Sequence, residues 1–248
     1  MIDPARSFGR VAEAYQRGRP SWPAAAVDLV ARDLGLERDD AVLDLGAGTG
    51  KLTRVLLERF DHVVSLEPDP SMRALLPASA EALAGTAEEI PLPERSVASV
   101  FCGESFHWFE WVRAIPEIAR VLRPGGGLVL MWNRPSGGLL ESAEWPPGVS
   151  ELLNGVGDPS PSERRYASFA WREALTGTPF ESLHFEVVPN PGWLDRDALI
   201  ARISSWSPIA SMPDAQRKAL LAELGALLTE STYRATLETH LYWARLAA

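Results

Sequence analysis

The sequence predicts an α/β protein with a mostly parallel sheet that helices cover on both faces. Three observations predict it. Between residues 36 and 134, short apolar runs alternate with helical patterns, the runs are apolar on both faces, and a glycine-rich loop joins the first run to its helix. Such strands, separated by helices, are typical of parallel sheets. A chain of 248 residues is long enough for one large domain of this class with an insertion.

The N-terminal region, residues 1–35, predicts two helices. Apolar residues repeat at helical spacing over Phe8–Gln16. A second helix begins around Pro23 with Ser21 as its N-cap, because serine accepts backbone N–H groups there and proline suits a first turn. This helix ends at Gly35, since glycine readily adopts the left-handed conformation that closes a helix.

Residues 36–134 form the core of the predicted sheet. Each predicted strand is a short apolar run, and each helix repeats its apolar residues every three or four positions, as Leu52, Val55 and Leu56 do. The expected elements are, in order, strand Ala41–Leu45, helix Lys51–Phe60, strand His62–Glu67, helix Pro70–Leu76, strand Ala80–Thr86, strand Val97–Cys102, helix Ile115–Leu122 and strand Leu128–Asn133.

Regularity falls after residue 134, and we assign residues 135–230 to insertions around a sixth strand that would cover the substrate. Glycine and proline predict a loop over Pro135–Asp158. The expected elements beyond it are helix Pro161–Leu175, strand Leu183–Val188, helix Asp195–Ile203 with Asp195 as its cap, helix Asp214–Leu228 and strand Thr236–Leu246. The last one alternates apolar and polar residues, although a helix is the alternative.

The most informative motif is the loop from Asp44 to Gly50, which has glycine at three alternate positions. A phosphate-binding loop needs G-x-x-x-x-G-K-[ST], and both ends of that motif are missing. A dinucleotide loop prefers G-x-G-x-x-G, and here the third glycine comes one residue early. The remaining pattern, Asp-x-Gly-x-Gly-x-Gly, places backbone N–H groups at a helix start, which suits a carboxylate or another anionic group.

Glu67 ends the second predicted strand, 21 residues after Gly46. An acid at that place accepts hydrogen bonds from the hydroxyls of an adenosine ribose. NAD and S-adenosylmethionine both carry that ribose, so Glu67 alone does not choose between them. Loop and acid together predict a ligand site at the ends of the first two strands.

Composition and charge argue against several classes of protein. The net charge of −9 argues against a general nucleic-acid binder, which would show a basic stripe. The N-terminus has no signal-peptide pattern, and no apolar run has the length of a membrane helix. One cysteine, Cys102, fits a reducing cytoplasm. No cluster of His, Cys and carboxylates has metal-ligand spacing, so we expect no metal.

Asp44–Gly50 resembles motif I of the class I S-adenosylmethionine-dependent methyltransferases. Tyr15–Pro23, Gly85–Leu92 and Leu122–Gly126 resemble stretches of their small-molecule members (methyltransferase type 11), and Ser105–Phe109 is similar to the F-H-W-[FL] segment in relatives of trans-aconitate methyltransferase. The resemblance implies a Rossmann-like doubly wound sheet of seven strands in the order 3-2-1-4-5-7-6, with strand seven antiparallel.

Two residues depart from the family pattern. Trp22 stands where a tyrosine is usual, and Glu67 stands where an aspartate is often found. The first departure keeps an aromatic ring, and the second keeps a carboxylate. The departures therefore leave the implied cofactor site intact.

The resemblance also implies roles for individual residues. The glycines would let the backbone approach the methionine end of the cofactor, which Asp44 would orient, and Glu67 would hold the ribose. Tyr15 and Arg19, in the segment 1–35, would close a lid. The implied cofactor-binding residues are Tyr15, Arg19, Asp44, Gly46, Gly48, Gly50, Glu67, Pro68, Met72, Thr86, Ala87, Glu88, Cys102 and Gly103. Of these, Pro68 to Glu88 would surround the adenine, and Cys102 and Gly103 would lie under the transferable methyl.

Polar residues after strands four and five are candidates for the chemistry. His107 would be a general base or a structural histidine in the F-H-W turn, and we favour the structural role. Glu104 is either a pocket acid or a solvated loop charge, and Asn133 either binds substrate or caps a turn. Cys102 suits a small buried hydrophobe better than a nucleophile. Aromatic residues that could line the acceptor pocket are Tyr15, Trp108, Trp111 and Trp206.

We therefore predict a cytoplasmic enzyme, a monomer or homodimer. It would transfer a methyl group from S-adenosylmethionine to O, N or C of a small molecule and release S-adenosylhomocysteine. A carboxylate acceptor would need no base, whereas a phenol, amine or carbon acid would need one. The alternatives are a non-catalytic S-adenosylmethionine-binding protein or a repurposed scaffold, and an NAD-dependent oxidoreductase.

Overall fold

The computed structural model describes residues 20–135, 146, 148–154, 156, 170–204 and 207–247. The chain divides into two units. The sheet unit comprises Ser21–Asn133, Ser162–Val188 and Thr239–Ala248, and the helical unit comprises Met1–Pro20, Arg134–Pro161 and Pro189–Glu238.

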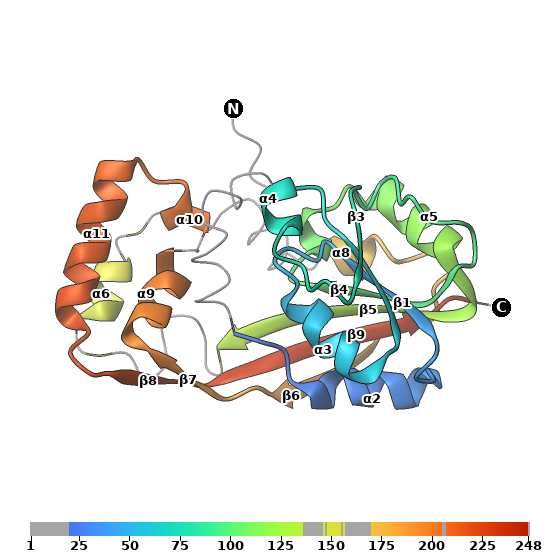
Figure 1. Ribbon diagram of the computed structural model, residues 1–248, viewed down its shortest axis with the longest axis horizontal. Coiled ribbons are helices and arrows are strands. Elements are labelled where there is room, and N and C mark those ends of the chain that lie inside the picture. The colour runs from blue at the N-terminus through green and yellow to red at the C-terminus, as the bar shows by residue number, and fades with distance from the viewer. Residues whose placement is uncertain are drawn as a thin grey trace. The chain divides into compact units, whose positions relative to one another are not determined.

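A sheet of seven strands forms the centre of the sheet unit, in the order β3-β2-β1-β4-β5-β9-β6 (Figure 1). These strands are β1 Ala41–Leu45, β2 His62–Leu66, β3 Glu81–Leu83, β4 Val97–Gly103, β5 Leu122–Pro135, β6 His184–Pro189 and β9 Leu237–Arg245. The first five strands pair in parallel. Leu246 N, one residue after β9, donates to Gly126 O near the start of β5, and Thr239 Oγ1 of β9 donates to Asn133 Oδ1 near the end of β5. The last strand therefore runs antiparallel to β5, which confirms the expected order and direction.

Helices cover both faces of this sheet. On one face lie α2 (Ala24–Leu34) and α3 (Lys51–Arg59), and on the other α5 (Trp111–Val121) and α8 (Ala170–Glu173). Alternate residues of one strand enter the two cores. In β5, Leu128, Leu130 and Trp132 pack on the α5 side, while Val129 and Met131 pack on the α2 side. This alternation explains why the strands are apolar throughout.

The helical unit has its own core. Its elements are α6 (Val149–Asn154), β7 (Gly192–Asp195), α9 (Arg196–Ser204), α10 (Ser207–Ala210), α11 (Asp214–Leu227) and β8 (Thr232–Ala235), and β7 pairs with β8 in antiparallel fashion. The buried residues of this core are Val149, Leu153, Val156, Leu199, Ile203, Ile209, Leu224, Leu228 and Tyr233. Asp195 Oδ1 accepts a hydrogen bond from Ala198 N at 2.6 Å, which confirms the predicted cap of α9.

Most predicted elements between residues 24 and 134 are confirmed, including Ala41–Leu45 to the residue and Gly35 as a left-handed helix end. The predicted N-cap Ser21 is wrong, because α2 begins at Ala24 and Pro23 occupies the cap position without a side-chain hydrogen bond. Predicted strand Ala80–Thr86 is shorter, with only Glu81–Leu83 paired to β2.

Four later predictions are confirmed to within about one residue at each end: strand Leu183–Val188, helix Asp195–Ile203, helix Asp214–Leu228 and strand Thr236–Leu246. The other later predictions are less accurate. The expected loop Pro135–Asp158 contains α6, and β7 and β8 were not predicted, since four residues carry too little alternation to identify a strand. Within predicted helix Pro161–Leu175, the described residues form α8. Helix Phe8–Gln16 lies outside the described residues.

The described part of the chain contains neither a membrane-spanning helix nor a cluster of metal-ligating side chains. No helix there combines the length and apolar character needed to cross a membrane. No three His, Cys, Asp or Glu side chains in that part of the chain gather closely enough to hold a metal ion.

Candidate active site

Asp44 lies near the end of β1 and is buried under α3. Its Oδ2 accepts a hydrogen bond from Thr53 Oγ1 at 2.6 Å, and Thr53 Oγ1 lies 3.0 Å from Ser65 Oγ on β2. Its other oxygen, Oδ1, is also buried but has no hydrogen-bond partner among the described residues. Burial, with a smaller contribution from the charge of Glu67, raises the pKa of Asp44 to about 7, although hydrogen bonding from Thr53 opposes the rise. A buried acceptor without a donor requires an explanation, and a bound ligand that donates to it would supply one.

Glu67 follows β2 and is held by two backbone N–H groups. Gly48 N donates to Oε2 at 2.8 Å and Asp69 N donates to Oε1 at 2.9 Å. Burial raises the pKa of this carboxyl group, and these two hydrogen bonds oppose the rise. Each oxygen keeps a second acceptor position, so the carboxylate is oriented to take two neighbouring hydroxyls.

The three loop glycines all have positive φ, but their surroundings differ. A Cβ on Gly46 would lie 2.7 Å from Ser105 Cβ, and one on Gly50 would lie 2.9 Å from side chains that follow α4 (Pro70–Arg73). Among the described residues, a Cβ on Gly48 would meet only Met72 Sδ, at 4.0 Å. Packing within the protein thus requires Gly46 and Gly50, whereas Gly48 presents an open face that a ligand could approach.

Residues that sequence reasoning missed support this loop. Arg54 Nη1 donates to Thr49 O and Gly50 O, both at 2.8 Å, and Arg54 Nη2 donates to Leu75 O at 2.9 Å. Ser105 Oγ donates to Leu45 O at 2.7 Å. Thr53 and Ser65 belong to the same group, and no local pattern in the sequence distinguishes these residues from other polar ones.

Cys102 and Gly103 end β4, and both are packed against protein. A Cβ on Gly103 would lie 2.9 Å from Trp22 Cζ2, so the tryptophan ring accounts for this glycine. Cys102 is fully buried, and burial raises the pKa of its thiol, with the charge of Asp44 adding to the effect. Neither feature supports a nucleophilic role for Cys102.

A hydrogen-bonded group lies where β4 and β5 end. Asn133 N donates to Glu104 Oε1 at 3.0 Å, and Asn133 Oδ1 accepts from Thr239 Oγ1 at 2.6 Å. Glu104 has a φ of 55°, which is unfavourable for a residue with a Cβ. The sequence predicted Glu104 and Asn133 at this place but did not predict Thr239.

His107 lies in the short 3₁₀-helix η3, Phe106–Trp108, and is buried. Its Nδ1 lies 3.1 Å from Trp132 Nε1 of β5. Of the predicted pocket aromatics, Trp108 packs beside His107, and Trp111 donates its Nε1–H to Phe106 O at 2.9 Å. Predicted residues Tyr15, Arg19 and Trp206 lie outside the described part of the chain.

The residues expected around the adenine lie on two segments. Met72 is buried beside Gly48, and Pro68 O accepts from Arg73 Nη1 at 3.1 Å. On the second segment Ala87 is buried, and Thr86 forms a bridge with Glu89. Glu88 Oε1 accepts from Glu110 N at 2.8 Å, so its carboxylate is engaged at the start of α5.

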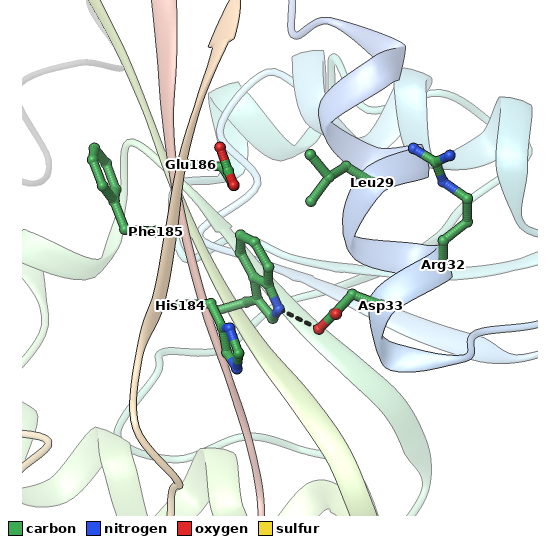
Figure 2. Close-up of a pocket in the computed structure, with 7 residues that line it drawn as sticks. Leu29, Arg32, Asp33, His184, Phe185 and Glu186 are labelled. Carbon is green, nitrogen blue, oxygen red and sulfur yellow. Dashed lines mark hydrogen bonds between the residues drawn. The ribbon is translucent and has the colours of Figure 1, made fainter.

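A surface hollow of about 510 Å³ lies elsewhere, between α2, β6 and β9 (Figure 2). Its lining residues are Leu29, Arg32, Asp33, His184, Phe185, Glu186 and Trp243. Trp243 stands near the end of β9, which pairs with the start of β5, so the hollow is remote from the carboxyl ends of the parallel strands. None of the described residues that were predicted for the active site lines it.

Ligands of open α/β sheets bind at the carboxyl ends of the strands, where Asp44, Gly48 and Glu67 lie. Comparisons with known proteins identify the ligand class. Residues 43–130 match a family model described as a methyltransferase domain. An uncharacterized methyltransferase of Mycobacterium tuberculosis is 40% identical over 231 residues, covering 91% of this chain and 87% of the relative. The chain belongs to the class I S-adenosylmethionine-dependent methyltransferases.

Solved structures agree with the methyltransferase fold. A proposed type II methyltransferase from Anaeromyxobacter dehalogenans has a TM-score of 0.66 at 24% identity, covering 92% of this chain and 98% of that one. A Haemonchus contortus N-methyltransferase in complex with phosphomonomethylethanolamine and S-adenosylhomocysteine has a TM-score of 0.59 at 14% identity, covering 100% of this chain and 61% of that one. The cofactor of the present methyltransferase, residues 1–248, is S-adenosylmethionine.

The residues of this methyltransferase fit that cofactor on three counts. The unpartnered Asp44 Oδ1 matches a cationic or N–H-bearing group, the open face of Gly48 leaves room beside the loop, and Glu67 is oriented for a diol. S-adenosylmethionine carries an ammonium group and a ribose diol. These hydrogen-bond donors are complementary to the carboxylate acceptors of Asp44 and Glu67.

Proposed function

We propose that this methyltransferase transfers the methyl group of S-adenosylmethionine to a small-molecule acceptor, and that Asp44, Gly48 and Glu67 are the centre of its cofactor site. The observation that carries the proposal is the buried, unpartnered Oδ1 of Asp44 beside an oriented Glu67 carboxylate. Glu67 would accept from the ribose hydroxyls, and Asp44 would bind the ammonium end. Residues Tyr15 and Arg19 remain proposed lid residues.

When bound, the cofactor supplies an activated methyl group on a sulfonium. The protein must then hold the acceptor in line with the S–CH₃ bond and exclude water, because positioning can supply much of the acceleration. The carboxyl end of β4 is the proposed place for the acceptor, with Glu104, Asn133, Trp108 and Trp111 at its margin. Glu104 is held by Asn133 N, which fixes its carboxylate for positioning substrate.

Among acceptor classes, we favour a carboxylate. A carboxylate oxygen is already nucleophilic at neutral pH, so its methylation removes no proton. The two candidate acid-base groups, Glu104 and His107, already have protein donors, from Asn133 N and Trp132 Nε1. The net charge of −9 and the absence of a basic stripe in the sequence support a small acceptor over a nucleic acid.

The test of the cofactor site is calorimetric titration with S-adenosylhomocysteine. We expect the Glu67→Gln variant to bind roughly 10- to 100-fold more weakly, since a charged acceptor of two hydroxyls is lost. Glu81→Gln, an exposed carboxylate at the start of β3, is the matched control and should bind as the unaltered protein does.

Two further results would separate the alternatives. Binding of NADH in place of S-adenosylhomocysteine would support the alternative function, an NAD-dependent oxidoreductase. Tight S-adenosylhomocysteine binding without turnover of any member of a broad panel of carboxylates, phenols and amines would indicate a non-catalytic binding protein.

A further inference from the structure

Trp132 and His107 form a buried hydrogen-bonded pair in the sheet unit. Trp132 is 0% exposed and His107 is 6% exposed, and the indole Nε1 lies 3.1 Å from the imidazole Nδ1. An indole nitrogen has a hydrogen and no available lone pair, so it can only donate. His107 Nδ1 must therefore be the acceptor and cannot carry a proton in this arrangement.

This contact determines the proton arrangement of the whole ring. A neutral imidazole carries one proton, and with Nδ1 accepting, that proton lies on Nε2. An imidazolium would place two N–H groups against each other at 3.1 Å. It would also remove the hydrogen bond that the buried indole N–H makes to Nδ1, which is unfavourable in the interior.

Packing prevents the indole from turning away. The Trp132 ring lies 4.9 Å from the Trp171 ring and 5.9 Å from the Tyr242 ring, measured between centroids. These neighbours come from α8 and β9, on the same face of the sheet. His107 is restrained as well, because Trp108 N donates to Ser105 O and closes the 3₁₀ turn around it.

We propose that Trp132 is a positioning residue that holds His107 as the neutral tautomer protonated at Nε2, so that Nδ1 of His107 is not available as a general base for the proposed methyl transfer. The catalytic half of this proposal rests on the proposed methyltransferase site. The tautomer itself is a property of the folded chain and is measurable without acceptor or cofactor.

The first experiment is two-bond ¹H–¹⁵N correlation NMR of protein labelled with ¹⁵N-histidine at neutral pH. The signals of His107 are assigned with His107→Gln, since the chain has four histidines. We expect an unprotonated-type shift at Nδ1 and a protonated-type shift at Nε2 in the unaltered protein. A proton on Nδ1, or equal population of both tautomers, would overturn the proposal without use of any Trp132 variant.

Trp132→Phe removes the indole donor but keeps an aromatic ring, and we expect it to mix the two tautomers of His107. Trp243→Phe is the matched control. It also removes a buried indole bond, from Nε1 to Asp33 Oδ2 at 2.7 Å, but on the opposite face of the sheet. A His107 spectrum that Trp132→Phe leaves unchanged, or that Trp243→Phe alters equally, would contradict the assignment to Trp132.

The catalytic half is tested with His107→Gln and His107→Leu and an acceptor that is turned over. Glutamine places an N–H donor near the position of Nε2 but cannot serve as a base, so we expect kcat within about 10-fold of the unaltered protein, and a larger loss for leucine. Equal losses of roughly 10²- to 10⁴-fold in both variants would indicate a base. Failure of the methyltransferase proposal would appear separately, as absent S-adenosylhomocysteine binding with an unchanged NMR result.

Discussion

At the scale of single residues, Asp44 links the cofactor site to stability. Its pKa in the folded protein is about 7, against 3.8 for an ordinary aspartate. The folded chain therefore binds this proton more tightly than the unfolded chain does, and stability is lost as pH rises from about 4 to about 7.

We expect Asp44→Asn to lack this loss. Between pH 4 and pH 8, the unfolding free energy of the unaltered protein should fall relative to that of the variant by about 3 to 4 kcal/mol, since one pKa unit corresponds to about 1.36 kcal/mol. Urea unfolding at both pH values measures the difference. Parallel pH dependence of the two proteins would show that Asp44 does not titrate in this range.

Gly48 offers a second test at the residue scale, because Gly35 matches it in backbone conformation. The φ values are 57° and 67°, and an added Cβ would meet no atom of the described residues closer than 4.0 Å at either position. We expect Gly48→Ala and Gly35→Ala to lose similar stability, about 1 to 2 kcal/mol each. Only Gly48→Ala should also weaken S-adenosylhomocysteine binding, by roughly 10-fold or more, as calorimetry would show. Equal affinities of the two variants would mean that the open face of Gly48 is not where the cofactor lies.

At the scale of elements, helix α3 carries two arginines that bind backbone carbonyls in different places. Arg54 holds Thr49 O and Gly50 O of the glycine loop, whereas Arg59 Nη2 donates to Leu36 O at 2.8 Å, after α2. We expect Arg54→Met to raise the dissociation constant for S-adenosylhomocysteine roughly 10-fold, because charged hydrogen bonds that shape the loop are lost. Arg59→Met should affect stability alone. A similar rise in both variants would point to a general effect on α3.

At the scale of the whole molecule, ligand binding should stabilise the sheet unit. S-adenosylhomocysteine at about 100 times its dissociation constant should add about 2.7 kcal/mol, while NADH should add nothing. Hydrogen exchange should then slow in Asp44–Gly50 and Glu67–Met72 of the sheet unit but not in α11 of the helical unit. Protection centred on the helical unit would place the cofactor elsewhere.

The sequence by itself determined the strands and helices of the parallel core, the glycine loop and Glu67 at the end of β2. These features depend on local patterns. Apolar periodicity comes from residues close together in the sequence, and positive φ values are favoured by glycine itself. The boundaries of Ala41–Leu45 and the αL end at Gly35 are examples. The strand order and the cofactor class followed from the family resemblance, and the observed sheet confirmed the strand order.

Only the tertiary structure decided which of the three glycines is open, which groups hold Asp44 and Glu67, and how His107 is protonated. Ser105 reaches Leu45 O across 60 positions, and Thr239 reaches Asn133 across 106. Such contacts depend on how strands align in space, and a single polar residue in an apolar run does not reveal its partner. The side chains that set the chemistry of Asp44 and His107, Thr53 and Trp132, therefore became identifiable only once the sheet had brought them together.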